Sequence, residues 1–156
     1  MLSKIMMVEI KSVSDIAAIM MWRDEVIEAV FGQSPEKGLI EANRDYYTRH
    51  IADGSHLAIA ASVGGKDAGC GGICFHEELP SPDNPTGRCA YLMNIYVREA
   101  FRHAGIGASI IRHLVGEARK RGCGKIYLET TDMAETLYGS IGFEPMKGML
   151  RIKDNL

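Results

Sequence analysis

The feature that most constrains this chain is an apolar strand that passes through a short glycine-containing loop into a helix. The strand is expected from Cys89 to Val97, a nearly continuous apolar run typical of a central strand buried on both faces. The loop contains Arg102, Gly105 and Gly107, and the helix is expected to run from about Gly105 to Arg121. This order, followed by another strand, predicts a parallel crossover and an α/β fold.

The same segment has the properties of an anion-binding site. The N–H groups in the first turn of a helix have no partner within the helix, and the helix dipole is positive at this end. Gly105 and Gly107 carry no Cβ atom, so a diphosphate could approach the backbone closely, and Arg102 would add a charged fork. We therefore expect a phosphate-containing ligand at this loop.

Two familiar phosphate-binding motifs fit this segment poorly. A P-loop ends in Gly-Lys-Ser/Thr, whereas this chain has Gly107-Ala108-Ser109, without the lysine. A dinucleotide fingerprint would place its third glycine at Ile110, although Glu129 stands where the ribose-binding acid belongs. Seven residues separate Val97 from Gly105, which is too long for the tight turn of that fold.

Apolar periodicity and turn residues predict the remaining elements. They are a strand over 7–13, a helix from a Ser14 cap to Gly32, a helix from Ser34-Pro35 to Gly54, strands over 57–63 and 66–75 joined at Gly64-Gly65, a strand over 125–130, a helix over 134–140, and closing strands over 143–146 and 149–153. The order is β-α-α-β-β-β-α-β-α-β-β, with a mixed central sheet. A chain of 156 residues fits a single domain, 1–156, with its core at about 7–154.

Composition excludes several classes of function. There are 18 Lys and Arg against 20 Asp and Glu, a formal net charge of −2, so no basic excess indicates a nucleic-acid partner. No apolar run reaches the ~20 residues that span a membrane. The N-terminal residues lack a secretory pattern, and we expect a cytoplasmic protein.

The cysteines predict neither disulfides nor a metal site. Cys70, Cys74, Cys89 and Cys123 include no CxxC pair. Along a strand Cys70 and Cys74 would lie about 13 Å apart, at ~3.3 Å per residue, too far to share a bond or an ion. We expect buried, reduced thiols.

Two motifs together resemble the signatures of the GNAT superfamily, the acetyl-CoA-dependent N-acetyltransferases. Arg102-x-x-Gly105-x-Gly107 is similar to its [Q/R]xxGx[G/A] signature. Ala134-x-x-Leu137-Tyr138-x-x-Ile141-Gly142-Phe143 is similar to its AxxLYxxxGF signature. One predicted helix and one predicted strand separate the two motifs, and the predicted element order over about 7–154 is similar as well.

The resemblance implies roles for the matching residues. The strand before the first signature would offer main-chain groups of Ile95 and Val97 to the pantetheine arm of acetyl-CoA. Tyr138 would lie beside the thioester sulfur and act as the general acid for the departing thiolate. Tyr91 stands where some relatives carry a catalytic glutamate, so the general base is not assigned. The cofactor loop would comprise Arg102, His103, Ala104, Gly105, Ile106, Gly107 and Ala108.

The acceptor is predicted to be a primary amine that attacks the thioester directly, without a covalent enzyme intermediate. Acidic residues in the loop before the cofactor strand, Glu77 and Glu78 together with Asp83, could hold a cationic amine or take its proton. A small-molecule amine is favoured. A protein or peptide amine, or a non-catalytic acyl-CoA-binding regulator, are the alternatives. Family members are often dimers, so a homodimer is expected.

Overall fold

The structure, a computed structural model, describes residues 7–154. The elements are β1 (Val8–Ser12), α1 (Ile16–Phe31), α2 (Lys37–Asp53), β2 (His56–Val63), β3 (Lys66–Glu77), β4 (Arg88–Val97), the short 3-10 helix η1 (Glu99–Phe101), α3 (Ile106–Lys120), β5 (Lys125–Leu128) and α4 (Asp132–Ile141). The predicted α/β class and the order of these elements are confirmed. None of the helices within this range combines the length and apolar character that a membrane crossing requires.

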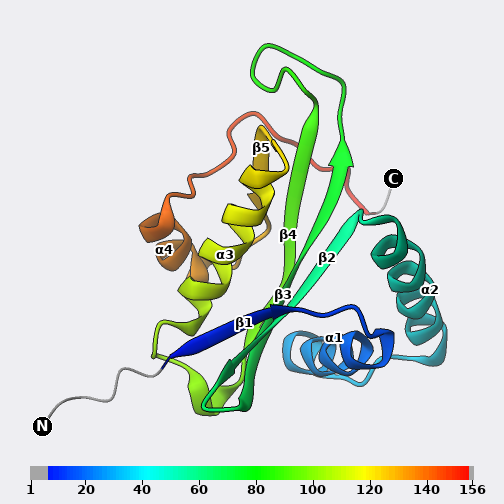
Figure 1. Cartoon of the computed structure of the whole chain (residues 1–156). Coiled ribbons are helices and arrows are strands. Elements are labelled where there is room, and N and C mark those ends of the chain that lie inside the picture. The colour runs from blue at the N-terminus through cyan, green and yellow to red at the C-terminus, as the bar shows by residue number, and fades with distance from the viewer. Residues whose placement is uncertain (1–6, 155–156) are drawn as a thin grey trace, which may run out of the picture.

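A five-stranded sheet in the order β1-β2-β3-β4-β5 forms the centre of the fold. Neighbouring strands are antiparallel except β4 and β5, which are parallel and joined through α3, as predicted. Helices α1 and α2 cover one face of the sheet, called the α1/α2 face below, and α3 and α4 lie on the other (Figure 1). The Gly64-Gly65 turn between β2 and β3 has positive φ at both residues, which matches a tight hairpin turn.

Apolar side chains pack on both faces. The larger cluster lies between the sheet and α3, whose buried stripe comprises Ile106, Ile110, Ile111, Leu114 and Ala118. A smaller cluster lies under α1 and α2 and contains Met20 and Tyr47. Trp22 is buried beside Cys70, whereas its neighbour Met21 is 55% exposed.

The starts of the first two helices differ from the prediction. Asp15, not Ser14, caps α1, because its carboxylate accepts a hydrogen bond from the N–H of Ala18 at 3.0 Å. Helix α2 begins at Lys37 after Glu36, and Ser34 donates instead to Glu28 at 2.6 Å. The C-terminal ends at Gly32 and Gly54, both left-handed, agree with the prediction.

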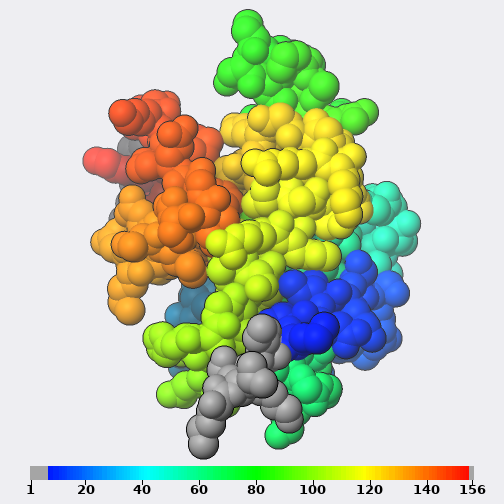
Figure 2. All heavy atoms as spheres, turned by 60° about the vertical axis from the view of Figure 1, so that its left-hand side comes forward, coloured from blue at the N-terminus to red at the C-terminus, as the bar shows by residue number. Residues whose placement is uncertain are grey.

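The predicted closing strands are wrong, because neither 143–146 nor 149–153 is a strand in the described chain. Pro145 lacks the N–H that a strand would pair, and Gly148 has φ +82, so neither residue supports an extended ladder. Residues 143–147 instead border one cavity together with Val115 and Arg119 of α3, orange-red beside yellow in Figure 2. The red end of the described chain then runs toward the α2 side (Figure 1). The outer edge of β5 is therefore left without a strand partner among residues 7–154.

Candidate active site

Strands β4 and β5 separate halfway along β4. Their register pairs residues Cys89–Leu92 of β4 with Lys125–Leu128 of β5, and it ends there. The second half of β4 is therefore only partly buried, which corrects the expectation of a strand buried on both faces. In the described chain no strand covers the outer edge of β4 from Met93 to Val97. Apart from the Val97 carbonyl, which accepts from Arg102, this edge can pair with an extended ligand.

A β-bulge lies at the point of separation. Gly72 pairs with Met93 and Cys70 with Tyr96, so β4 has one extra residue between these pairs. Asn94 lies in the bulge and has φ +58, a left-handed conformation that asparagine tolerates. Beyond the bulge, Ile95 packs with the cluster under α3, and the side chain of Asn94 turns to the α1/α2 face.

The loop after β4 presents unpaired N–H groups at the start of α3. His103 and Gly105 have φ of +64 and +78, and alternation of left-handed and right-handed residues turns successive N–H groups to one side. Within residues 7–154 no protein acceptor is bonded to the N–H groups of the six residues from His103 to Ala108. A Cβ atom at Gly105 would meet no atom within 4 Å, and one at Gly107 would meet only Val97 at 3.7 Å, so the space before the helix is open.

Arg102 is held at the base of this loop. Its Nε donates to the carbonyl of Val97 at 3.0 Å, and its guanidinium lies 6.0 Å from the ring centroid of Tyr96. The other guanidinium nitrogens have no partner in the described chain, so they remain able to meet a phosphate. Three further cations lie exposed on α3, and they are Arg112, Arg119 and Lys120.

Tyr138 projects from α4 and packs against the cluster under α3. Its ring meets Phe143 edge-on with 5.7 Å between centroids. Burial raises the pKa of the Tyr138 phenol above its usual value, so the hydroxyl keeps its proton at neutral pH. A protonated phenol is the form that a general acid needs.

The predicted acidic residues lie at the opposite end of β4 from the loop. Glu77 ends β3, opposite Arg88, and Glu78 follows it. The Glu78 carboxylate accepts from Lys125 Nζ at 2.8 Å and lies 3.2 Å from His76 Nε2, and these contacts hold its pKa below the usual range. The loop that carries Asp83 projects beyond the body of the protein (Figures 1 and 2).

One donor cluster was not expected from the sequence. Ligand atoms of His76, Glu78 and Cys89 all lie within 4.8 Å of one another, a donor set that zinc accepts. The ammonium of Lys125 already neutralises Glu78, and the Tyr127 hydroxyl lies 3.2 Å from His76 Nε2. The four cysteines are unpaired, with Cys70 and Cys89 buried and Cys74 and Cys123 partly buried.

Glu129 follows β5 immediately, at the point where β5 leaves β4. Tyr127 stacks on Tyr91 with 5.0 Å between ring centroids. Burial, and then the carboxylate of Glu129, raises the pKa of Tyr91 to about 12. Sequence reasoning considered this acid only as a ribose ligand, because the separation of the strands was not visible in the sequence.

Both adjacent tyrosines of α2 contact the α1/α2 face. Tyr47 is buried, and the Tyr46 hydroxyl lies 2.9 Å from His56 Nδ1 and 2.9 Å from Cys74 Sγ. Burial, with smaller contributions from nearby positive charges, lowers the pKa of His56 to about 4. This polar cluster brings together residues far apart in the sequence, and no local motif marks it.

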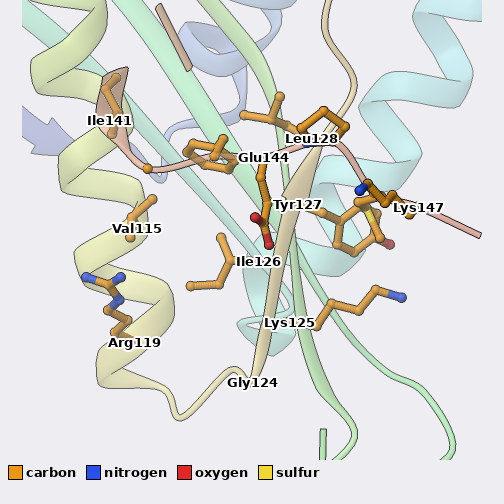
Figure 3. A pocket seen from close by; sticks show the side chains of 14 residues that line it. Val115, Arg119, Gly124, Lys125, Ile126, Tyr127, Leu128, Ile141, Glu144 and Lys147 are labelled. Atoms are coloured by element: carbon orange, nitrogen blue, oxygen red, sulfur yellow. The ribbon is translucent and has the colours of Figure 1, made fainter. Parts of the chain in front are cut away.

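A cavity of about 730 Å³ lies elsewhere, along the free edge of β5. Val115 and Arg119 of α3 and the segment 141–147 enclose it. Figure 3 shows Val115 and Ile126 on one side of β5 and Tyr127 and Lys125 on the other. The loop from His103 to Ala108 does not line this cavity. The phosphate-binding geometry rests on the loop and on the separated strands.

Comparison with known proteins decides the family. The sequence profile of the Acetyltransferase (GNAT) family matches residues 20–143, most of the chain. The chain belongs to the GNAT acetyltransferase family. Both signature motifs lie within the matched range, so the resemblance seen in the sequence is confirmed.

Individual relatives agree with this membership. Glucosamine 6-phosphate N-acetyltransferase 1 of rice (Oryza sativa subsp. japonica) is 35% identical over 90 residues, which are 56% of this chain and 53% of the relative. The chain thus matches about half the length of that curated relative.

Solved structures share the GNAT fold. A predicted acetyltransferase of Clostridium acetobutylicum, solved with acetyl-CoA, has a TM-score of 0.83 at 23% identity, covering 94% of this chain and 96% of its own. The aminoglycoside N-acetyltransferase AAC(6')-Iy, solved with a bisubstrate analogue, has a TM-score of 0.74 at 12% identity, covering 96% and 99%.

Proposed function

We propose that this GNAT protein transfers an acetyl group from acetyl-CoA to a primary amine of a small molecule. The observation that carries the proposal is the continuity of two features on one strand. The open edge of β4, from Met93 to Val97, is followed through η1 by six residues with unpaired N–H groups, from His103 to Ala108, at the start of α3. This arrangement fits a ligand with an extended amide-containing arm followed by a diphosphate.

The chemistry follows from the separated strands. Main-chain groups of Ile95 and Val97 would bind the arm of acetyl-CoA, and an N–H of β4 near the bulge would stabilise the oxyanion as the amine attacks the thioester carbon. Collapse of the tetrahedral intermediate breaks the C–S bond, and the Tyr138 phenol gives its proton to the thiolate. The products are the acetylated amine and CoA.

The amine must lose a proton during this reaction. Glu129 stands at the separation of β4 and β5, and we propose it as the group that takes the proton, directly or through water. Glu77 and Glu78 remain predicted contacts of the acceptor. Because Glu78 is already paired with Lys125, it is better suited to holding a cationic amine than to acting as the base. Relatives named for glucosamine 6-phosphate and aminoglycosides support a small-molecule amine.

An amine panel tests the proposal. Purified protein is mixed with acetyl-CoA and with amino sugars, amino acids, polyamines and lysine-containing peptides, one at a time. Thiol release and the mass of each product are then measured. We expect acetylation of at least one small amine above the rate of acetyl-CoA hydrolysis without an amine. Acetylation of peptides alone would show that the acceptor is a protein amine. Binding of acetyl-CoA without any product would favour a non-catalytic regulator. The cytoplasmic location and the homodimer remain predictions.

A further inference from the structure

The side chain of Arg23 connects three elements at the bulge of β4. It projects from α1 and is partly buried. Its Nε donates to Asn43 Oδ1 of α2 at 3.1 Å, and its Nη1 donates to Asn94 Oδ1 of β4 at 2.9 Å. The guanidinium therefore lies on the α1/α2 face, against the residue at which β4 separates from β5.

The two amides orient this cation without neutralising it. The Nδ2 group of Asn43 donates to the carbonyl of Leu39 at 2.8 Å, and that of Asn94 faces Cys70 Sγ at 4.0 Å, so both amide oxygens face Arg23. Within residues 7–154 no carboxylate oxygen lies within 4.0 Å of its nitrogens. The two amides supply no negative charge, and Nη2 has no partner among the described residues.

A second arginine against the same helix shows what a structural cation looks like in this fold. Arg98 lies four residues after the bulge residue Asn94, and its Nε and Nη2 donate to the carboxylate of Glu25 at 3.0 and 2.9 Å. Arg23 is two residues from Glu25 on α1 and has no such pair. Because an unpaired charge is costly to bury even in part, a purely structural role would favour a carboxylate partner.

The field of Arg23 extends across the α1/α2 face. Burial raises the pKa of Cys74, and the charge of Arg23 opposes that effect. Burial raises the pKa of Tyr47 to about 12, again against the effect of Arg23. In His56, burial first and then His50 and Arg23 lower the pKa. The charge of Arg23 therefore acts on three groups of the α1/α2 face, in the same direction at each.

From these contacts we propose that Arg23 binds an anionic group, a carboxylate or a phosphate, on the acceptor amine. The inference rests on the proposed acetyl transfer. The fork of Arg23 suits two oxygens of one oxyanion, and Asn43 and Asn94 fix its plane. Because Asn94 is the bulge residue itself, the anion would lie only a few bonds from the attacking nitrogen. The substrate class is amino acids or phosphorylated amino sugars rather than simple alkylamines.

Matched amine pairs test this assignment. L-phenylalanine is compared with phenethylamine, which lacks only the carboxylate, and glucosamine 6-phosphate with glucosamine. The readout is the ratio of kcat/KM values within each pair at saturating acetyl-CoA, since a uniform loss of activity leaves a ratio unchanged. For the wild type we expect a ratio of about 10 to 100 in favour of the anionic member of at least one pair, the effect of a charge-assisted hydrogen bond. The pair that shows this preference identifies the anionic group that Arg23 binds as a carboxylate or a phosphate.

Variants assign the effect to Arg23. Arg23→Gln should reduce the ratio to about 1, and Arg23→Lys, which keeps the charge but loses the fork, should give an intermediate ratio. Arg44→Gln, at an exposed position of α2, is the control and should leave the ratio unchanged. If Arg23→Gln does not fold, Arg23→Lys alone decides.

The outcomes separate the two proposals. A wild type that acetylates amines without preferring the anionic member of either pair overturns the role of Arg23 and leaves acetyl transfer intact. A ratio that survives in both Arg23→Gln and Arg23→Lys also overturns it. A wild type that acetylates no amine in the panel overturns the proposed function itself.

Discussion

Arg98 donates two hydrogen bonds to the carboxylate of Glu25, from Nε at 3.0 Å and from Nη2 at 2.9 Å. Its guanidinium lies 4.5 Å from the ring centroid of Trp22. Arg98 directly follows β4, so this pair fixes the base of the phosphate-binding loop to the middle of α1. Its main-chain N–H donates to Ala68 at 2.8 Å, which also ties the loop to β3.

Loss of this pair should weaken the fold. Glu25→Gln removes the charge and keeps the shape, and both side chains of the pair are about one-third exposed (33% and 31%). We expect the free energy of unfolding to fall by about 1–2 kcal/mol, between the values for exposed and buried pairs. The control is Glu41→Gln, whose exposed pair with Lys37 at 3.8 Å should be worth less than about 0.5 kcal/mol. Equal effects in chemical denaturation would contradict the assignment.

A negative charge at the loop should abolish cofactor binding without harming the fold. Gly107 lies in the first turn of α3, where the helix dipole stabilises an acidic side chain and where an added Cβ atom would contact only Val97. Gly107→Asp would repel the diphosphate there. For the wild type, acetyl-CoA at 100 times its dissociation constant should stabilise the fold by about 2.7 kcal/mol. The variant should show no such shift in thermal denaturation.

Gly116→Asp is the matched control for this charge. It adds the same side chain to the same helix, also where a Cβ atom meets nothing within 4 Å, but away from the loop. It should keep the acetyl-CoA shift. A normal shift in Gly107→Asp would place the cofactor elsewhere.

Much of the fold could be predicted from local patterns, and the errors have physical causes. Gly32, Gly54 and Gly64-Gly65 end or turn elements through their own backbone freedom, so they are visible in the sequence. Whether Ser14 or Asp15 caps α1 depends on one hydrogen bond, which composition does not decide. The apolar residues of 149–153 have a strand-like pattern, but strands need a partner, and β5 has only four residues.

The candidate site likewise has one part that the sequence predicts and one part that it does not. The loop with Gly105 and Gly107 is contiguous, and its properties follow from its residues. The separation of β4 from β5 and the approach of Arg23 to Asn94 involve residues distant in the sequence. Such relationships arise from packing, and a single sequence without a structure does not reveal them.

Acidification should destabilise the protein through His56. This residue is 5% exposed, and burial lowers its pKa to about 4, so the folded protein keeps the imidazole neutral where the unfolded chain, with a pKa of ~6.5, binds a proton. The free energy of unfolding should therefore fall as the pH decreases from about 6.5 to about 4, by up to about 3 kcal/mol. The groups that face the ring are Tyr46, Tyr47 and Cys74, with Arg23 and His50 nearby.

Nuclear magnetic resonance separates His56 from other titrating groups. The ring proton signals of His56 should show a midpoint near pH 4, and unfolding curves of His56→Gln should depend less on pH over the same range. A midpoint near the ordinary value of ~6.5 would contradict the buried, neutral assignment.

Tyr138→Phe tests the proposed general acid, because it keeps the ring and its packing on Phe143 and deletes only the hydroxyl. The tetrahedral intermediate must expel CoA as a thiolate, and a phenol whose pKa is raised by burial stays protonated and able to donate at neutral pH. General acid catalysis contributes ~10²–10⁴-fold, so the chemical step should slow by at least about 100-fold while acetyl-CoA binding stays nearly constant. A single-turnover measurement is needed, since product release could limit kcat. Ser140→Ala, which removes an exposed hydroxyl from the same helix, should leave the rate unchanged. A slowing of less than about threefold in a folded Tyr138→Phe protein would show that Tyr138 only packs, because a lost proton donor costs far more than that.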